Sequence, residues 1–183
     1  MTVTRIKGPT IMLASGSYFD LEDPASSEFG IEDIAHALAH ICRYTGHTRE
    51  FYSVAQHCVL VARNLPLHLA LQGLLHDATE AYLGDVSAPL KAMLPDYRAI
   101  EARVEAALLA HFDLPPVLDP LVKRMDLVLL ATEKRDLMPH NNGDAWAMLR
   151  SVECLPDRIV ALPHAEAEAQ FLSMYTRLTG RLR

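Results

Sequence analysis

The chain has 183 residues, a length that suits one domain. Half of the residues are hydrophobic, which provides for a sizeable core. The net charge of −6, without a block of Lys or Arg, argues against wrapping a nucleic acid polymer. No apolar stretch reaches membrane-spanning length, and no apolar run follows the basic residues near the N-terminus. We therefore expect neither a membrane segment nor a signal peptide.

The three cysteines, Cys42, Cys58 and Cys154, lack CxxC spacing. An odd set of this kind is typical of reduced thiols, so we expect a cytoplasmic protein. We interpret the thiols as structural.

The first thirty residues are rich in Gly, Ser, Asp and Pro, and we interpret residues 1–30 as an irregular N-terminal arm. Within it, Ile6 to Leu13 is expected to form a short strand that Ser15-Gly16-Ser17 ends. Residues 31–183 are predicted to form a single helical domain, because strand signals there are few.

Helical periodicity begins at Ile31, where apolar residues recur at three- and four-residue steps as far as Ile41. Gly46 provides a stop for this first helix. Ser53 stands three residues before Gln56, the spacing of a capping box that opens a second helix.

Proline marks the start of several later helices. Pro66 suits the first turn of a third helix that reaches about Glu80. Asp119-Pro120 predicts an N-cap and first turn. The remaining elements are expected to be helices at about 97–111, 119–137 and 163–178, the last closed by Gly180, and a loop at Asn141 to Asp144. The fold class is thus predicted to be an all-α helical bundle.

Ionisable residues lie where apolar ones are expected. His57 and Asp126 share the apolar faces of their helices, and His76 and Asp77 lie at the edge of another. Gly73, one turn earlier, leaves room for a neighbouring helix or a ligand. A carboxylate turned inward is costly unless it is paired or binds a metal.

Together these four residues predict a metal site. Each residue alone is more often a satisfied core histidine or a helix cap, so the prediction depends on their conjunction. Two imidazoles and two carboxylates can give a divalent ion a mixed nitrogen and oxygen coordination. Co, Mn, Zn, Fe and Mg are all compatible with the set.

The order of His57, His76-Asp77 and Asp126 resembles the HD superfamily of metal-dependent phosphohydrolases. The segment Tyr-Ser-Val-Ala-Gln-His that ends at His57 is similar to the one that bears the first metal histidine in bacterial 5′-deoxynucleotidases of this superfamily. Residues 74–85, Leu-Leu-His-Asp-Ala-Thr-Glu-Ala-Tyr-Leu-Gly-Asp, and the Pro-Leu-Lys that ends at Lys91 resemble their central motif. The resemblance covers roughly residues 31–137.

The resemblance implies an HD-type helical domain and a role for each matched residue. The metal ligands would be His57, His76, Asp77 and Asp126. Glu80 would handle a proton or orient the attacking water, and Asp85 would be a further carboxylate of the site. Dinuclear members need more histidines between the HD aspartate and the last ligand than this chain has, so one divalent metal ion is expected.

Four residues are candidates for substrate contact. Arg43 and Tyr44 precede His57 at about the interval where those nucleotidases place an arginine and an aromatic residue, typically Trp, that contact the nucleotide. Arg43 and Lys91 suit phosphate, because guanidinium forms a bidentate fork and ammonium a point charge, although both also fit ordinary surface charge. His47 follows the Gly46 stop in a loop position from which it would reach a substrate.

These observations predict a hydrolase that removes phosphate from (deoxy)nucleoside 5′-monophosphates with metal-activated water. Residues 31–50 also look like viral deoxyadenosine-triphosphate hydrolases of the superfamily, so release of triphosphate is a second hypothesis. A nucleotide or metal sensor without turnover is a third. The expected partners are a small phosphorylated substrate and a second copy of the chain in a homodimer or larger homo-oligomer.

Three other features have more than one interpretation. His36 and His40 have metal-ligand spacing on a helix, but charges on their side favour a solvated or subunit-facing polar stripe. Glu133 is either a group that supports the metal site or part of a buried ion pair. Trp146, in the 139–162 region, would anchor a lid or a subunit contact.

Overall fold

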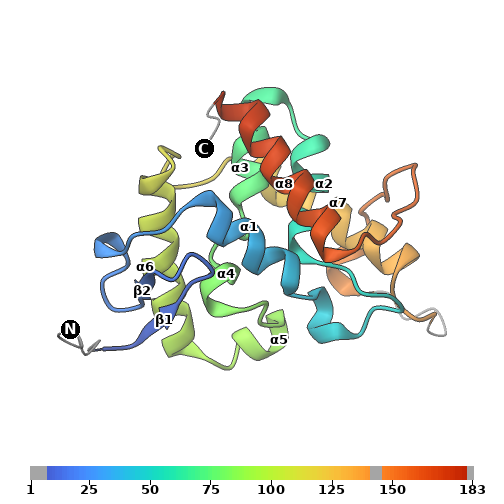
Figure 1. The fold of residues 1–183 in the computed structure, drawn as a ribbon. Helices are drawn as coiled ribbons and strands as arrows, with labels where there is room; N and C mark the ends of the chain where they lie inside the picture. Colours follow the sequence, from blue (N-terminus) through green and yellow to red (C-terminus); the bar gives the residue numbers. More distant parts are fainter. Residues whose placement is uncertain (1–7, 141–145, 181–183) are drawn as a thin grey trace.

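The computed structural model describes residues 8–140 and 146–180, and over these residues the chain is an all-α bundle with a short N-terminal arm (Figure 1). The prediction of the fold class is confirmed. The helices are α1 (Ile31–His40), α2 (Val54–Arg63), α3 (Ala70–Leu75), α4 (Glu80–Leu83), α5 (Ala88–Lys91), α6 (Pro95–His111), α7 (Pro120–Asp136) and α8 (His164–Thr179). None of these described helices has both the length and the hydropathy that a bilayer span requires.

The arm contains a small antiparallel hairpin. Strand β1 (Thr10–Met12) lies inside the segment predicted to be extended and pairs with β2 (Tyr18–Asp20), which was not predicted. Residues 6 and 7 lie outside the described residues. Phe19 of β2 is fully buried, and its ring stacks on that of Tyr82 at a centroid distance of 3.8 Å. The hairpin is therefore attached to the helical core through aromatic packing.

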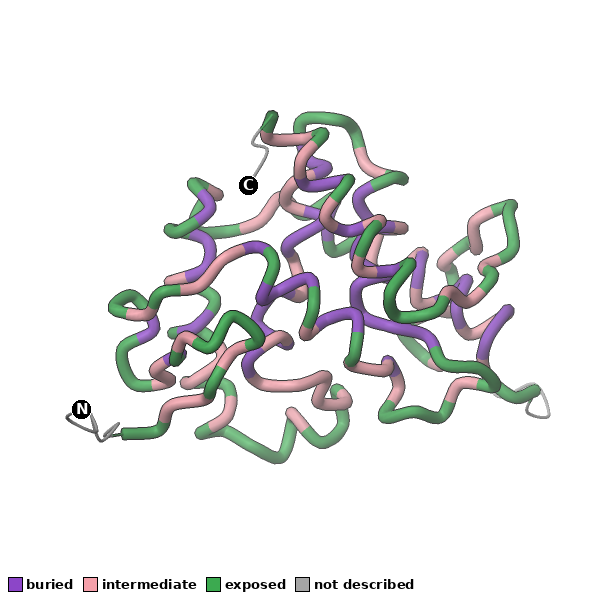
Figure 2. The backbone as a smooth tube through the Cα atoms, viewed as in Figure 1, coloured by how far each residue is buried: buried purple, intermediate pink, exposed green. Residues whose placement is uncertain are grey.

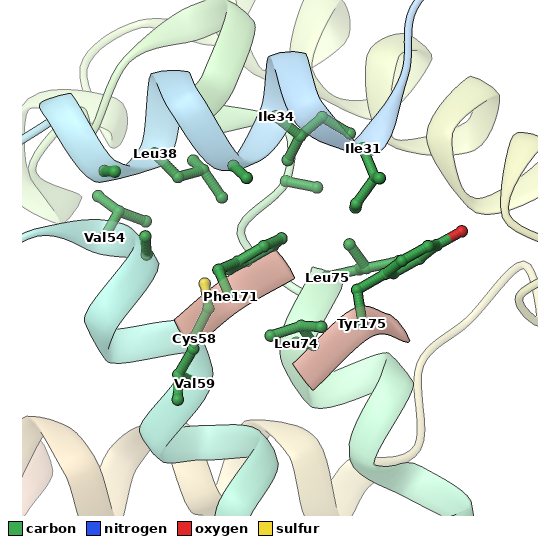
Figure 3. Packing of buried hydrophobic residues seen from close by; sticks show 14 of the residues in the cluster. Ile31, Ile34, Leu38, Val54, Cys58, Val59, Leu74, Leu75, Phe171 and Tyr175 are labelled. Atoms are coloured by element: carbon green, nitrogen blue, oxygen red, sulfur yellow. The ribbon is translucent and has the colours of Figure 1, made fainter. Parts of the chain in front are cut away.

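The core lies where α8 crosses α1, α2 and α3 (Figures 1 and 3). Phe171 and Tyr175 of α8 reach between apolar side chains of the three other helices, among them Ile34, Val59 and Leu74. Figure 2 shows that the buried backbone is concentrated in this central region and that the connecting segments are mostly exposed. The core thus encloses α2, the helix that carries His57.

Several predicted helix ends are confirmed. The Ser53 hydroxyl accepts a hydrogen bond from the Gln56 amide at 3.2 Å, and the Asp119 carboxylate accepts one from the Leu121 amide at 2.8 Å. Gly180 closes α8 with a φ of 66°, in the left-handed region that glycine adopts without strain. The loop predicted at 141–144 lies outside the described residues.

The first helix is shorter than predicted and ends at His40 instead of continuing to Gly46. The next residues are extended, because Cys42 forms an antiparallel bridge with Ser53 and the Arg43 amide donates to the Tyr52 carbonyl at 2.9 Å. A turn follows at Arg43–Gly46, in which two residues have positive φ. Backbone pairing with a distant segment therefore replaces the last turn of the helix.

The helix predicted from Pro66 to about Glu80 is also divided. It consists of a 3-10 turn, α3, a tight turn at 76–79 and α4. Across this turn the Ala78 amide donates to the Leu75 carbonyl and the Glu80 amide to the Asp77 carbonyl, which is the i to i+3 pattern of a 3-10 helix. The tighter winding rotates His76 and Asp77 away from the direction that a continuous α-helix would impose.

Candidate functional site

The four predicted metal ligands lie together at one point of the bundle. His57 stands in the middle of α2 and is fully buried, and Asp126 stands in the middle of α7. His57 Nε2 lies 3.3 Å from His76 Nε2, 3.6 Å from Asp77 Oδ2 and 3.4 Å from Asp126 Oδ1. His76 Nε2 lies 3.2 Å from Asp77 Oδ2. Their capacity to bind a metal stays a prediction.

The hydrogen bonds of the two imidazoles determine their tautomers. His57 Nδ1 faces a carboxylate oxygen of Glu133 at 2.6 Å, and His76 Nδ1 faces the Gly73 carbonyl at 2.8 Å. Both partners only accept, so both Nδ1 atoms carry a proton. Each Nε2 then either offers a lone pair, if the ring is neutral, or carries a second proton, if the ring is charged. Protons on both Nε2 atoms would be forced against one another at 3.3 Å.

The carboxylates make this cluster attract positive charge. Burial opposes ionisation of Asp77, but the charge of His76 outweighs it and lowers the pKa of Asp77. Burial also opposes ionisation of Asp126, and its contact with His57 lowers the pKa of that carboxyl. The pKa of His76 is raised in turn, because Asp77 outweighs the burial of the ring. Two acceptor nitrogens and two carboxylates are a donor set that a divalent cation satisfies.

Cys58 is a further neighbour of His76, with its sulfur in the same group of possible ligand atoms as His76 and Asp77. Burial raises the pKa of this thiol to about 11, so it stays protonated near neutral pH. This agrees with the interpretation of Cys58 as structural.

Glu133 connects the metal ligands to the surrounding polar groups. It is fully buried and accepts hydrogen bonds from His57 Nδ1, from the Tyr52 hydroxyl at 2.9 Å and from the Tyr44 hydroxyl at 2.5 Å. Burial opposes its ionisation, but Arg43 and His57 lower its pKa to about 2. The interpretation of Glu133 as part of a buried ion pair is confirmed, and its support of a metal site through His57 stays a prediction. Its position seven residues after Asp126, on the same face of α7, was the available sequence signal.

Arg43 borders the cluster with its guanidinium. Its Nη1 lies 3.4 Å from Asp77 Oδ2 and its Nε lies 3.3 Å from Glu133 Oε2. The two residues that follow, Tyr44 and Thr45, have φ values of 56° and 54°. Consecutive non-glycine residues in this left-handed region are strained, and such strain persists where the surrounding structure holds the backbone in place.

Glu80 and Asp85 are two further carboxyls whose charges interact with that of Asp77. Glu80 begins α4 and is buried, and its Oε2 has no hydrogen-bond partner among the described residues. Burial, reinforced by the charges of Asp77 and Asp85, raises the pKa of Glu80 to about 9. The pKa of Asp85 is also raised, chiefly by burial. The Glu80 carboxyl therefore retains its proton near neutral pH.

Two predicted substrate contacts, Lys91 and His47, stay predictions. Lys91 pairs with Glu101 and lies over the Tyr97 ring at 5.6 Å, and His47 is exposed. Among the described residues, no hydrogen bond or ion pair joins Lys91 or His47 to the cluster. Lys123, which sequence reasoning missed, contacts Asp126 Oδ2 at 2.7 Å from an exposed position.

Tyr44 lies at the edge of the site with Trp146. The two ring centroids are 6.0 Å apart, and the Tyr44 hydroxyl reaches Glu133 on its other side. The structure therefore brings Trp146, which sequence reasoning left between a lid and a subunit contact, to the border of the candidate site.

Comparison with known proteins adds the family. No family model matches the chain. The chain is 39% identical over 166 residues to the uncharacterized protein YfdR of Escherichia coli (strain K12). The aligned residues cover 90% of this chain and 93% of YfdR. The chain belongs to the same family as YfdR. An uncharacterized protein of Rhodobacter capsulatus is 42% identical over 122 residues, which are 61% of this chain and 62% of that protein.

Proposed function

We propose that this member of the YfdR family is a metal-dependent phosphohydrolase that removes phosphate from (deoxy)nucleoside 5′-monophosphates. The observation that carries the proposal is that the Nε2 atoms of His57 and His76 lie 3.3 Å apart. The Nδ1 atoms of both rings already donate hydrogen bonds to other groups. One divalent cation at this point would satisfy both lone pairs and the carboxylates of Asp77 and Asp126. When bound, it would polarise a phosphoryl oxygen and lower the pKa of a water molecule.

Glu80 is the proposed proton-transfer group. Its buried carboxyl lies beside Asp77, and a pKa of about 9 favours the protonated form at pH 7. A protonated carboxyl can donate to the 5′-oxygen of the nucleoside as the phosphorus–oxygen bond breaks. The charge of Asp85, a further carboxyl of the proposed site, contributes to the raised pKa of Glu80.

Arg43 is the proposed phosphate contact. Its guanidinium is held at the edge of the cluster by Asp77 and Glu133, so it would be oriented before a substrate arrives. A planar fork of N–H donors suits two oxygens of one phosphate. The neighbouring rings of Tyr44 and Trp146 offer an aromatic surface for a base, which favours a nucleotide over a phosphate ester without one.

The proposal is tested with purified chain and a panel of ribo- and deoxynucleoside mono-, di- and triphosphates, with Co, Mn, Zn or Mg added in turn. Released phosphate and triphosphate are both measured. We expect phosphate from monophosphates with wild type, and background release with Asp77→Ala, which also loses bound metal while its circular dichroism spectrum is kept. Asp23→Ala, which removes an exposed carboxylate of the arm, is the matched control and is expected to behave like wild type.

Each other outcome contradicts part of the proposal. Triphosphate released from triphosphates would replace it with a triphosphohydrolase. Metal and nucleotide binding without turnover across the panel would indicate a sensor. Full activity in Asp77→Ala would remove the cluster from the mechanism.

A further inference from the structure

A second group of possible metal ligands lies on the surface between α1 and α8. The two helices lie side by side, with the start of α8 beside the end of α1 (Figure 1). Each helix contributes two residues one turn apart: His36 and His40 from α1, and His164 and Glu168 from α8. Residues with this spacing lie on one helix face. The two pairs share no residue with the cluster around His57.

Contacts across the interface bring the two pairs together. His36 Nδ1 lies 3.4 Å from Glu168 Oε2, and the rings of His40 and His164 are 4.7 Å apart. One ligand atom from each of His36, His40 and Glu168 lies within 4.8 Å of the other two. Neighbouring ligand atoms of a tetrahedral zinc site are about 3.3 Å apart, given zinc–nitrogen bonds of about 2.0 Å. A small rotation of these side chains would reach that spacing, and the exposure of the two histidines permits it.

The tautomer of His40 is already set for binding. His40 Nδ1 lies 2.7 Å from the His36 carbonyl, which only accepts, so Nδ1 carries the proton and Nε2 presents a lone pair. A hydrogen bond from the second ring nitrogen to a backbone carbonyl is the usual support of a histidine that binds a metal. An ion pair between His36 and Glu168 alone would leave the convergence of two further imidazoles on the same spot without a cause.

We propose that His36, His40 and Glu168 bind a first-row transition-metal ion, with His164 as the adjoining fourth donor. Imidazole nitrogen suits Zn²⁺, Ni²⁺, Co²⁺ and Cu²⁺ and excludes the oxygen-preferring Mg²⁺ and Ca²⁺ as preferred occupants. The ion would join the two helices at the point where α1 ends. This site is independent of the proposed hydrolase activity, since its ligands lie outside that site.

The test is isothermal titration of metal-free full chain with Ni²⁺ or Zn²⁺. His36→Gln/His40→Gln is expected to bind about one equivalent less than wild type, and His68→Gln, which removes an exposed histidine elsewhere, is expected to match wild type. A stoichiometry of the double variant equal to that of wild type would overturn the proposal. Circular dichroism verifies that each variant is folded.

The contribution of α8 is tested separately with Glu168→Gln. We expect this change to weaken binding at least about tenfold, because loss of even an outer hydrogen-bond partner weakens a metal site by about that factor. Glu166→Gln, which alters an exposed carboxylate on another side of α8, is the matched control. If Glu168→Gln binds like wild type, the ion is held by α1 alone and the proposed link between the helices is wrong.

Discussion

Glu133 holds His57 through Nδ1 and thereby turns Nε2 toward His76, Asp77 and Asp126. A carboxylate that binds the second nitrogen of a ligand histidine fixes its tautomer and increases its basicity. At the scale of single residues, the proposed metal site therefore depends on a side chain that would not itself touch the ion.

Replacing Glu133 with Gln is expected to lower the affinity for a divalent metal about 10- to 100-fold, the range seen when such supporting groups are changed. The amide oxygen of Gln still accepts from His57, but the negative charge is gone. Metal affinity is measured by competition with a chelating dye. Glu50→Gln, at an exposed position, serves as control, and equal affinities of the two variants would contradict the assigned role.

The depressed pKa of Glu133 also predicts how stability depends on pH. Its pKa falls from an ordinary value of 4.5 to about 2 in the folded protein, so its contribution is present above about pH 4.5 and is lost as pH falls toward 2. The contribution is on the order of 3 kcal/mol. The difference in unfolding free energy between metal-free wild type and Glu133→Gln should narrow as urea titrations move from pH 6 to pH 3. A constant difference would show that the Glu133 charge does not stabilise the fold.

At the scale of elements, the close approach of α3 to α2 positions His76. A Cβ added to Gly73 would lie 3.3 Å from Ala62 Cα, 3.2 Å from Val61 Cγ1 and 2.5 Å from Leu65 Cδ1. The room that sequence reasoning assigned to a helix or a ligand is taken by α2. The carbonyl of the same glycine accepts the hydrogen bond of His76 Nδ1.

Gly73→Ala is accordingly expected to destabilise the protein. Overpacking costs about 1–3 kcal/mol, of which about 1 kcal/mol is offset by the better helix propensity of alanine. Urea unfolding at pH 7 measures the net effect, which we expect to be a lower midpoint with an unchanged slope. A midpoint equal to or above that of wild type would mean that the two helices are free to separate.

At the scale of the whole molecule, α8 closes the bundle over α1, α2 and α3. Phe171 is fully buried among residues of α1, α2 and α3, although it follows α1 by more than a hundred positions in the chain (Figure 3). Its packing joins the last helix to the first ones, so removal should affect the unfolding of the domain as one unit.

Phe171→Ala is expected to lower the free energy of unfolding by about 3–5 kcal/mol, the range for a buried Phe replaced by Ala. The exposed Ser173→Ala on the same helix is the control and should change it little. Calorimetry and urea titration measure the effect. If Phe171→Ala lowers the free energy of unfolding no more than Ser173→Ala does, α8 is not required for a stable core.

The local sequence determined which segments are helical, several of their ends, and the inward direction of His57 and Asp126. Helix periodicity and capping at Ser53 and Asp119 act within a few residues, so they can be inferred without knowing the fold. The candidate cluster was predictable for the same reason, because His57 and Asp126 stand on faces that a helix must bury.

Only the tertiary structure decided the early end of α1, the bonds of Glu133, the pairing of Lys91 with Glu101, and the meeting of α1 with α8 that brings Glu168 to His36. Each depends on a partner outside the local segment, at a separation that runs from ten residues for Lys91 and Glu101 to more than a hundred for His36 and Glu168. Local propensity says nothing about such partners, because a hydrogen bond or ion pair between distant segments forms only after burial of the core has brought them together.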